Sequence, residues 1–529
     1  MSETSTPAVD GALPPDPTRR SDTSVSAAMR GEPELDPKRW LALAVIGVTQ
    51  LMIVLDASIV NIALPSAQRD LGITQGDLQW VLTAYTLAFG GLLLLGGRIA
   101  DYAGRKRALI VGLLGFAGAS AIGGIAPNAM TLFLARGLQG AFGAVMAPAA
   151  LAMITVTFTK PDERAKAFGV FGAIAGGGAA IGLILGGVLT EYLSWRWCLG
   201  VNVPIAIVTA VAAVAILRES KAHGDTRYDL PGAALATSGL VSLVYGFTEA
   251  SKEGVGWTAG STIGFLVASV VLLAGFVAWE LRTAHPLLPM RVILDRNRGG
   301  SYLVFFFLGA GMFAMFLFLT FYFQRNLGYS PLKSGFAFLP FSGGIILTAG
   351  VAAQLLPRVG PKPLMLVGLV MATIGMAGLT QLDADSGYAG WVLPIEIILS
   401  VGMALVFIPA SSTALVGVGE HDAGVASAVL NTSQQIGGSL GTALLNTLFA
   451  SAVTDFIAER AAQMPPPDPN ADPSLAQQAM AQLQNLAFLH GYRVAFFWGG
   501  VMFVGALISA AVLIKARKED LPAEGAVVA

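Results

Sequence analysis

Long apolar runs, separated by short polar or turn-forming segments, fill most of the chain from residue 39 onward. A run of about 20 apolar residues is long enough to cross a bilayer as a helix. The pattern predicts fourteen such helices, an even number that places both termini on the same side of the membrane. The expected spans are residues 39–67, 79–101, 107–127, 131–157, 163–192, 197–218, 229–251, 257–283, 298–325, 331–356, 362–382, 388–417, 424–453 and 488–514.

Composition and charge support a membrane protein and give its orientation. The chain has 529 residues, of which only 12% are charged, and its mean hydropathy is +0.68. Soluble domains carry about 25% charged residues. If the N-terminus is cytoplasmic, 24 of the 32 Lys and Arg fall in cytoplasmic segments and 7 in external ones. Since positive charge accumulates inside, we expect a multi-pass cell-membrane protein with both termini cytoplasmic.

A weak internal repeat at an offset of 256 residues predicts the domain organisation. Residues 101–113 align with residues 357–369, and Gly182 falls on Gly438. Two duplicated six-helix halves, typical of one architecture of secondary transporters, would then flank two inserted helices. The fold class expected is an all-α polytopic membrane protein. Its parts would be a disordered cytoplasmic tail (1–38), an N-terminal bundle (39–218), a linker with two extra spans (219–297), a C-terminal bundle (298–515) and a second tail (516–529).

Residues 454–489 contain a Pro-rich stretch followed by an Ala/Gln-rich run. We expect an external loop there with one short helix.

Three charged residues inside apolar spans are the first functional candidates. We expect Asp56, Arg136 and Glu396 to lie at similar depth in the outer half of the membrane. Asp56 is about 25 Å into the first span, which starts inside, and Arg136 is about 8 Å into the fourth, which starts outside. Charged side chains at such depth are costly and usually functional. The sequence therefore predicts a titrating, proton-coupling cluster of two acids and one arginine.

The segment joining the second and third spans, residues 97–107, combines one acid, two glycines and a basic cluster. The glycines permit close approach and turning, and Asp101 can cap the next helix or pair with Arg105. We expect a cytoplasmic gating loop formed by Gly97, Asp101, Gly104, Arg105 and Lys106.

Five motifs carry a family resemblance. Residues 97–107 match the G-x-x-x-D-x-x-G-R-K/R loop of the major facilitator superfamily. The other four resemble motifs of its fourteen-span drug:proton antiporters, the EmrB/QacA type: LDASIVNIALP at 55–65, RGLQG at 136–140, WRWCLGVNVP at 195–204 and NTSQQIGGSLG at 431–441. The resemblance implies the major facilitator fold and export by alternating access, with a proton gradient in place of any cofactor. In the fifth-span antiporter motif this chain has Leu183 where the family has Pro.

Small and polar residues in the spans complete the candidates. Gly178, Gly182 and Gly186 form a small-xxx-small ridge, which with Gly187 favours close helix packing. Candidate substrate-cavity residues come from four of the expected spans and have polar or adaptable side chains, although core or lipid-facing packing remains open for the aromatic ones. They are Gln50, Asn61, Gln139, Asn431, Gln434, Gln435, Phe305 and Phe313.

The leading hypothesis is a proton-driven exporter of amphipathic organic molecules or drugs. A dedicated exporter of one metabolite, antibiotic or lipid fits the same pattern, and a membrane enzyme or a non-transporting receptor stays as a remote alternative. The sequence has one cysteine, no zinc-binding or nucleophile motif and no phosphate-binding lysine loop, which argues against an enzyme, a metal site and an ATP-driven pump. The expected partners are a small-molecule substrate, protons and the lipid bilayer, without nucleic acid, and the protein is expected to be a monomer.

Overall fold

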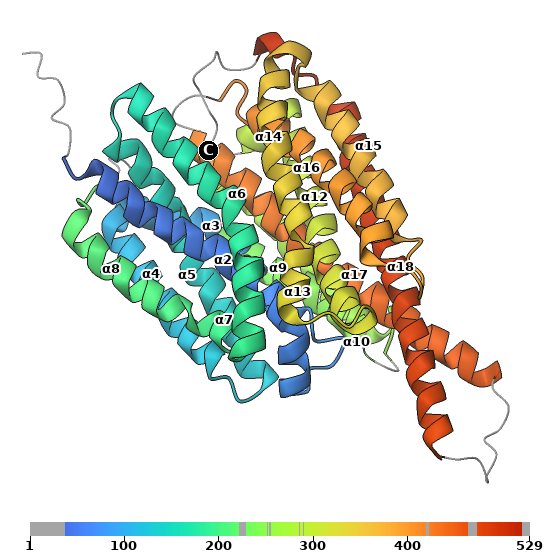
Figure 1. Ribbon diagram of the computed structural model, residues 1–529. Helices are drawn as coiled ribbons and strands as arrows, with labels where there is room; N and C mark the ends of the chain where they lie inside the picture. Colours follow the sequence, from blue (N-terminus) through green and yellow to red (C-terminus); the bar gives the residue numbers. More distant parts are fainter. Residues whose placement is uncertain are drawn as a thin grey trace, which may run out of the picture.

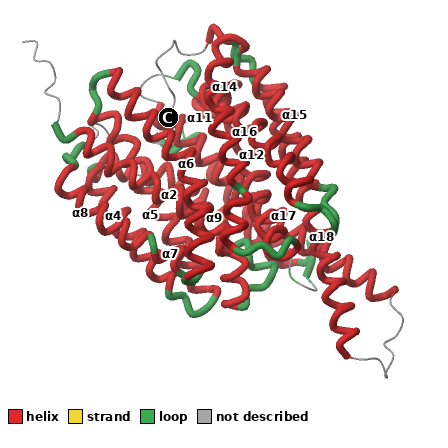
Figure 2. Tube along the Cα trace, in the orientation of Figure 1, coloured by secondary structure: helices red, strands yellow, loops and turns green. Residues whose placement is uncertain are grey.

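A computed structural model describes residues 37–221, 229–250, 252, 255–284, 286–288, 290–418, 423–463 and 473–520. The secondary structure of these residues is helical (Figure 2). Among the described residues, fourteen helices are long and apolar enough to cross a membrane, and each overlaps one of the fourteen expected spans. The predicted tail 1–38 lies outside the described residues except for its last two, and the tail 516–529 is described only to residue 520.

Two bundles of helices lie side by side, with a pair of further helices against both (Figure 1). The pair is α9 and α10, of which α9 contacts both α3 of the first bundle and α17 of the second. The first bundle comprises α2 (Arg39–Leu71), α3 (Trp80–Ala103), α4 (Arg105–Gly124), α5 (Ala129–Thr157), α6 (Pro161–Tyr192), α7 (Trp197–Gly200) and α8 (Asn202–Ile216). The pair is α9 (Leu230–Ala250) and α10 (Gly260–Glu280). The second bundle comprises α11 (Met290–Ile293), α12 (Arg296–Phe321), η1 (Tyr322–Asn326), α13 (Pro331–Ala337), α14 (Leu339–Val359), α15 (Pro361–Leu379), η2 (Tyr388–Val392), α16 (Leu393–Ala414), α17 (Ala423–Gln463), α18 (Pro473–Leu513) and η3 (Lys518–Asp520).

The sequence repeat corresponds to a repeated local structure. Gly104 and Gly360 directly precede the third membrane-spanning helix of their bundles, α4 and α15. Their φ angles are positive, 116° and 88°, which favours glycine. Two residues later, Lys106 Nζ donates to the Val214 carbonyl at 2.8 Å. Lys362 Nζ likewise donates to a carbonyl near the end of α18 at 2.6 Å. Each bundle thus ties the start of its third helix to the end of its last one.

The segment 454–489 differs from the expectation of a loop with one short helix. Helices α17 and α18 are 41 residues each and continue through most of this segment, projecting beyond the bundles as two helical arms (Figure 1). The rings of Phe456 and His490 stack on each other between α17 and α18, with their centres 5.2 Å apart. The Ala/Gln-rich run has high helix propensity without a long apolar stretch, which a search for membrane spans does not detect. Residues 464–472 lie outside the described residues.

The bundles meet closely at one end, where α6 approaches α13. A methyl group added at Gly187 would lie 2.6 Å from the Leu332 Cα, and one added at Gly335 would lie 2.5 Å from the Leu183 carbonyl oxygen. In the described part of the chain, four hydrogen bonds also join the bundles at this end. They run from Gln324 to the Ile62 carbonyl, from Arg325 to Gln68, from the Leu332 amide to Glu191 and from Asn446 to the Gln75 carbonyl.

Candidate functional site

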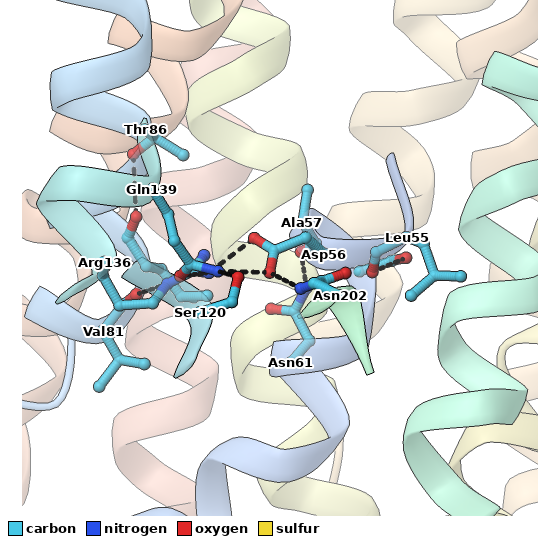
Figure 3. Close-up of polar contacts among 12 residues, drawn as sticks. Leu55, Asp56, Ala57, Asn61, Val81, Thr86, Ser120, Arg136, Gln139 and Asn202 are labelled. Carbon is cyan, nitrogen blue, oxygen red and sulfur yellow. Dashed lines mark hydrogen bonds and ion pairs between the residues drawn. The ribbon is translucent and has the colours of Figure 1, made fainter. Parts of the chain in front are cut away.

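Asp56 and Arg136 form an ion pair inside the first bundle. Asp56 lies in the middle of α2 and Arg136 near the start of α5, and Arg136 Nη1 is 2.7 Å from Asp56 Oδ2 (Figure 3). Their side chains are 0% and 1% exposed. Acidic and basic residues are almost never this buried unless they are paired. The predicted meeting of these two charges is therefore present in the structure.

Two amides complete the shell around the carboxylate. Asp56 Oδ1 accepts from Asn202 Nδ2 at 2.7 Å and from Gln139 Nε2 at 3.0 Å (Figure 3). Gln139 also donates to Ser120 Oγ at 2.7 Å, and its own Oε1 accepts from Arg136. The carboxylate thus receives donors from α5 and α8, and the network reaches α4. An ionised acid in an apolar interior needs several hydrogen-bond donors of this kind to remain charged.

The arginine is held from a third direction by α3. Its Nε donates to the Val81 carbonyl at 2.9 Å, and its guanidinium carbon lies 4.5 Å from the centre of the Tyr85 ring. A desolvated guanidinium over an aromatic face is stabilised by about 2 kcal/mol. A cavity of about 10 Å³, lined in part by Arg136 and Cys198, adjoins the pair and is about the size of one water molecule.

Glu396 does not join this pair, so the predicted three-residue cluster is wrong. It lies near the start of α16, which packs against α12, α14 and α15 of the second bundle. Its side chain is 0% exposed, and neither carboxyl oxygen accepts a hydrogen bond. The neighbouring Tyr388 hydroxyl donates instead to the Ala337 carbonyl at 2.8 Å. A depth along the membrane normal, which is all that the sequence could predict, gives no lateral position.

The segment predicted to gate, residues 97–107, is an ordered helix junction. Asp101 Oδ1 accepts two hydrogen bonds from Arg105, at 3.0 and 2.8 Å, as the sequence suggested. Asp101 does not cap α4, however. The backbone amides of Lys106 and Arg107 donate to the Glu219 carboxylate at 3.1 and 3.3 Å, so this acid, from beyond α8, occupies the helix N-terminus. Any side chain at Gly104 would collide with the same carboxylate, 2.6 Å from a β-carbon.

The glycines of α6 separate into two contact surfaces. Methyl groups at Gly178, Gly182 and Gly186 would lie 3.2, 2.0 and 2.8 Å from atoms of α2, so this ridge lets α2 and α6 approach closely. Gly187, on another face, approaches α13 of the second bundle. Three of the four predicted packing glycines therefore hold one bundle together, and the fourth lies at the contact between bundles.

The predicted substrate-cavity residues do not form one site. Gln139 is fully buried as a partner of Asp56, and Phe305 is buried with its ring 5.5 Å from Phe407, so both belong to the interior. Asn61 donates to the Ala57 carbonyl within its own helix.

The remaining candidates lie on α2, α12 and α17. Asn431 is exposed and donates to the Ser427 carbonyl within its own helix, whereas Gln50 is partly exposed. The Gln435 Cβ lies 3.1 Å from the position of a methyl group on Gly90 of α3, so it belongs to the contact between bundles. Gln434 is partly exposed next to the close approach of α17 to α12, and Phe313 packs beside Gly438.

Sequence reasoning missed several residues that hold the ion pair. Asn202, Ser120 and Tyr85 were not among the candidates, although Asn202 lies in one of the recognised motifs. A lone polar residue in an apolar span is the signal that could have identified Asn202, because such residues usually face another polar group.

Comparison with known proteins identifies the class. The sequence profile of the Major Facilitator Superfamily matches residues 46–442. The chain belongs to this family of membrane transporters and is not an enzyme, which confirms the resemblance drawn from the motifs.

Similar curated proteins are named for antibiotic resistance or export. The chain is 47% identical to the puromycin resistance protein pur8 of Streptomyces alboniger, over 93% of this chain and 94% of that protein. It is 38% identical to the cephamycin export protein CmcT of Amycolatopsis lactamdurans (83% and 91% covered). It is 30% identical to the tetracenomycin C resistance and export protein of Streptomyces glaucescens (94% and 94%).

Solved structures share the fold at low sequence identity. A bacterial homologue of the human lysosomal transporter Spinster, in an inward-facing and unoccupied conformation, has a TM-score of 0.62 at 16% identity, with 91% of this chain and 98% of that chain covered. An auto-inhibited peptide transporter of the POT family has a TM-score of 0.61 at 17% identity (92% and 99%). These matches confirm the predicted fold class.

Proposed function

We propose that the protein exports antibiotics or similar drug-like molecules in exchange for protons, with Asp56 as the coupling acid. The observation that carries this proposal is a carboxylate with no solvent exposure, held by Arg136, Gln139 and Asn202 on two other helices. Relatives named for resistance to or export of puromycin, cephamycin and tetracenomycin C support the export direction and the substrate class.

The network suggests how protonation couples to conformation. While its three donors surround it, Asp56 is stable as an anion inside the bundle. Moving α5 or α8 away from α2 would leave a buried charge without compensation, at a cost of several kcal/mol. A proton removes this cost by neutralising the acid. The proton therefore stabilises one arrangement of the helices and substrate the other, which is the coupling that exchange requires.

The close contact between the bundles supports a proposal about which side of the membrane is closed. Under the orientation inferred from the Lys and Arg distribution, the end where α6 meets α13 is extracellular. On this orientation, which also places both termini in the cytoplasm, we infer that the bundles are closed toward the outside. We expect it to work as a monomer in the cell membrane. Cysteines placed in residues 98–107 and 284–297 should be labelled only from the cytoplasmic side, and labelling from outside would refute this orientation.

Glu396 is a second candidate for proton binding. Its two oxygens accept no hydrogen bond, so the group is satisfied only as a protonated acid that donates, for example to the neighbouring Tyr388 oxygen. It lies in the other bundle, where it could sense substrate independently of Asp56.

A narrower function, export of one antibiotic only, is favoured by the same relatives, because their names refer to single compounds. Efflux from proteoliposomes, driven by an imposed pH gradient, tests both versions with a panel of puromycin, a cephamycin, tetracenomycin C and lipophilic cations. Uphill movement of several unrelated compounds supports multidrug export, and movement of one supports the narrower function. Transport of none, or transport that ignores the pH gradient, contradicts proton-coupled export.

A further inference from the structure

A second pair of buried acids lies between the two inserted helices, outside the site described above. Asp229 immediately precedes α9 and is 6% exposed, and Glu280 ends α10 and is 3% exposed. In the described part of the chain, neither acid forms an ion pair with a lysine or arginine. Acids so thoroughly buried require another form of compensation.

Hydrogen bonds satisfy one oxygen of each acid and leave the other without a partner. Asp229 Oδ1 accepts from the Gly232 amide at 2.9 Å and from Trp279 Nε1 at 2.7 Å. Glu280 Oε2 accepts from the Leu288 amide at 3.0 Å. Asp229 Oδ2 and Glu280 Oε1 are both buried and have no partner. The backbone and indole donors therefore fix the orientation of each carboxyl group.

The two unpartnered oxygens face the same small space, beside Gly232. A methyl group at Gly232 would lie 2.5 Å from Asp229 Oδ2 and 2.7 Å from Glu280 Oε1. The two oxygens therefore lie near the same point in space, although no hydrogen bond joins them. Two ionised carboxylates at such range repel, whereas a single proton between them forms a short, charge-assisted O–H···O⁻ hydrogen bond. One proton would satisfy both oxygens at once.

Nearby cations are engaged elsewhere or lie beyond hydrogen-bonding contact. Arg98 of α3 donates to the Pro286 carbonyl at 3.2 Å and to the Tyr102 hydroxyl at 2.9 Å. Arg282, two residues after Glu280, lines a surface depression with Trp279. Among the described residues, neither Arg98 nor Arg282 bonds to the two acids.

We propose that Asp229 and Glu280 form a second proton-binding site, in which one proton is shared between Oδ2 and Oε1. This site lies outside the Asp56 network and does not depend on the proposed transport mechanism. The shared proton joins the start of α9 to the end of α10. Glu280 also holds the Leu288 amide, and the adjacent Pro286 carbonyl receives Arg98, three residues before the gating-loop acid Asp101. Loss of the proton therefore loosens the inserted helices next to that loop.

Purified full-length protein in detergent, without substrate, provides the test. Asp229→Asn and Glu280→Gln each replace one acid by an amide whose N–H can take the place of the shared proton. Infrared spectra over a pH titration report protonated carboxyl groups, and thermal unfolding at each pH reports stability. The wild-type protein should show a protonated-carboxyl contribution, in addition to that of Glu396, that each variant lacks. Its unfolding midpoint should fall as pH rises through loss of the shared proton, and both variants should lose this pH-dependent fall.

Two control variants isolate the pair. Glu249→Gln removes another acid of α9, one that forms an exposed ion pair with Lys252 at 2.6 Å, and should keep the band and the pH dependence. His285→Gln removes the histidine of the same sequence segment and should also leave both unchanged.

Three results would overturn the proposal. The first is a band and a pH dependence that persist in both amide variants. The second is a rise of the lowered unfolding midpoint at high pH when sodium is added at constant pH. Such a rise would make the pair a cation site. The third is a protonated-carboxyl band that has the same intensity in the wild-type protein and in both variants. Because the two acids are changed separately, one variant that fails to fold leaves the other to decide.

Discussion

Replacing Gly186 by alanine tests how tightly α6 packs against α2. The new methyl group would lie 2.8 Å from the Ile59 carbonyl oxygen and 2.9 Å from its Cγ1. Because a carbonyl oxygen cannot rotate away, the helices must separate by a few tenths of an ångström. Overpacking of this kind costs about 1–3 kcal/mol. Alanine recovers about 1 kcal/mol of helix propensity, which leaves a net loss of about 0–2 kcal/mol.

Gly172→Ala is the matched control in the same helix. A methyl group there has no atom within 4 Å, so only the propensity gain of about 1 kcal/mol remains. The two variants should therefore differ in unfolding free energy by about 1–3 kcal/mol, with Gly172→Ala the more stable. Denaturant unfolding in detergent micelles, followed by circular dichroism, measures this difference. Equal unfolding midpoints for the two variants would refute the close contact between α2 and α6.

Three further changes test the site and its surroundings. Asn202→Leu removes a donor to the central carboxylate and should abolish pH-driven efflux in proteoliposomes while the protein still elutes as a single species. Asp101→Asn weakens the pair with Arg105 and should slow efflux several-fold without loss of substrate binding by calorimetry, so parental efflux would contradict a gating role. Glu163 accepts two hydrogen bonds from Arg39, which lower its pKa below the ordinary 4.5. This bridge stabilises the fold above about pH 4.5 and is lost as pH falls further, so Glu163→Gln should flatten the acid side of the thermal-stability profile.

The membrane spans and the internal repeat could be predicted because they depend on local patterns. Apolar run length alone gave all fourteen spans. The repeat rested on a few identities, and one of them, the aligned pair Lys106 and Lys362, makes equivalent hydrogen bonds in the two bundles. The helical arms of α17 and α18 were missed because their composition favours helix without being apolar.

The site could be predicted only in part, because sequence gives depth and helix face but no lateral distance. Asp56 and Arg136 were correctly brought together, whereas Glu396, which was predicted to lie at the same depth, is in the other bundle. The cap of α4 illustrates the same limit. Its acid, Glu219, is 113 residues from the Lys106 amide in sequence and could not be chosen over the nearby Asp101 without the fold.

The central claim is that Asp56 binds the proton that is exchanged for substrate. The most direct measurement is substrate-induced proton release from purified protein in weakly buffered detergent solution at several pH values. The wild-type protein should release protons on addition of its substrate, and Glu396→Gln should retain part of this release. Asp56→Asn should bind substrate, by calorimetry in parallel, yet release none. Release from Asp56→Asn equal to that of the wild-type protein would contradict the account and move the coupling site away from the Asp56–Arg136 pair.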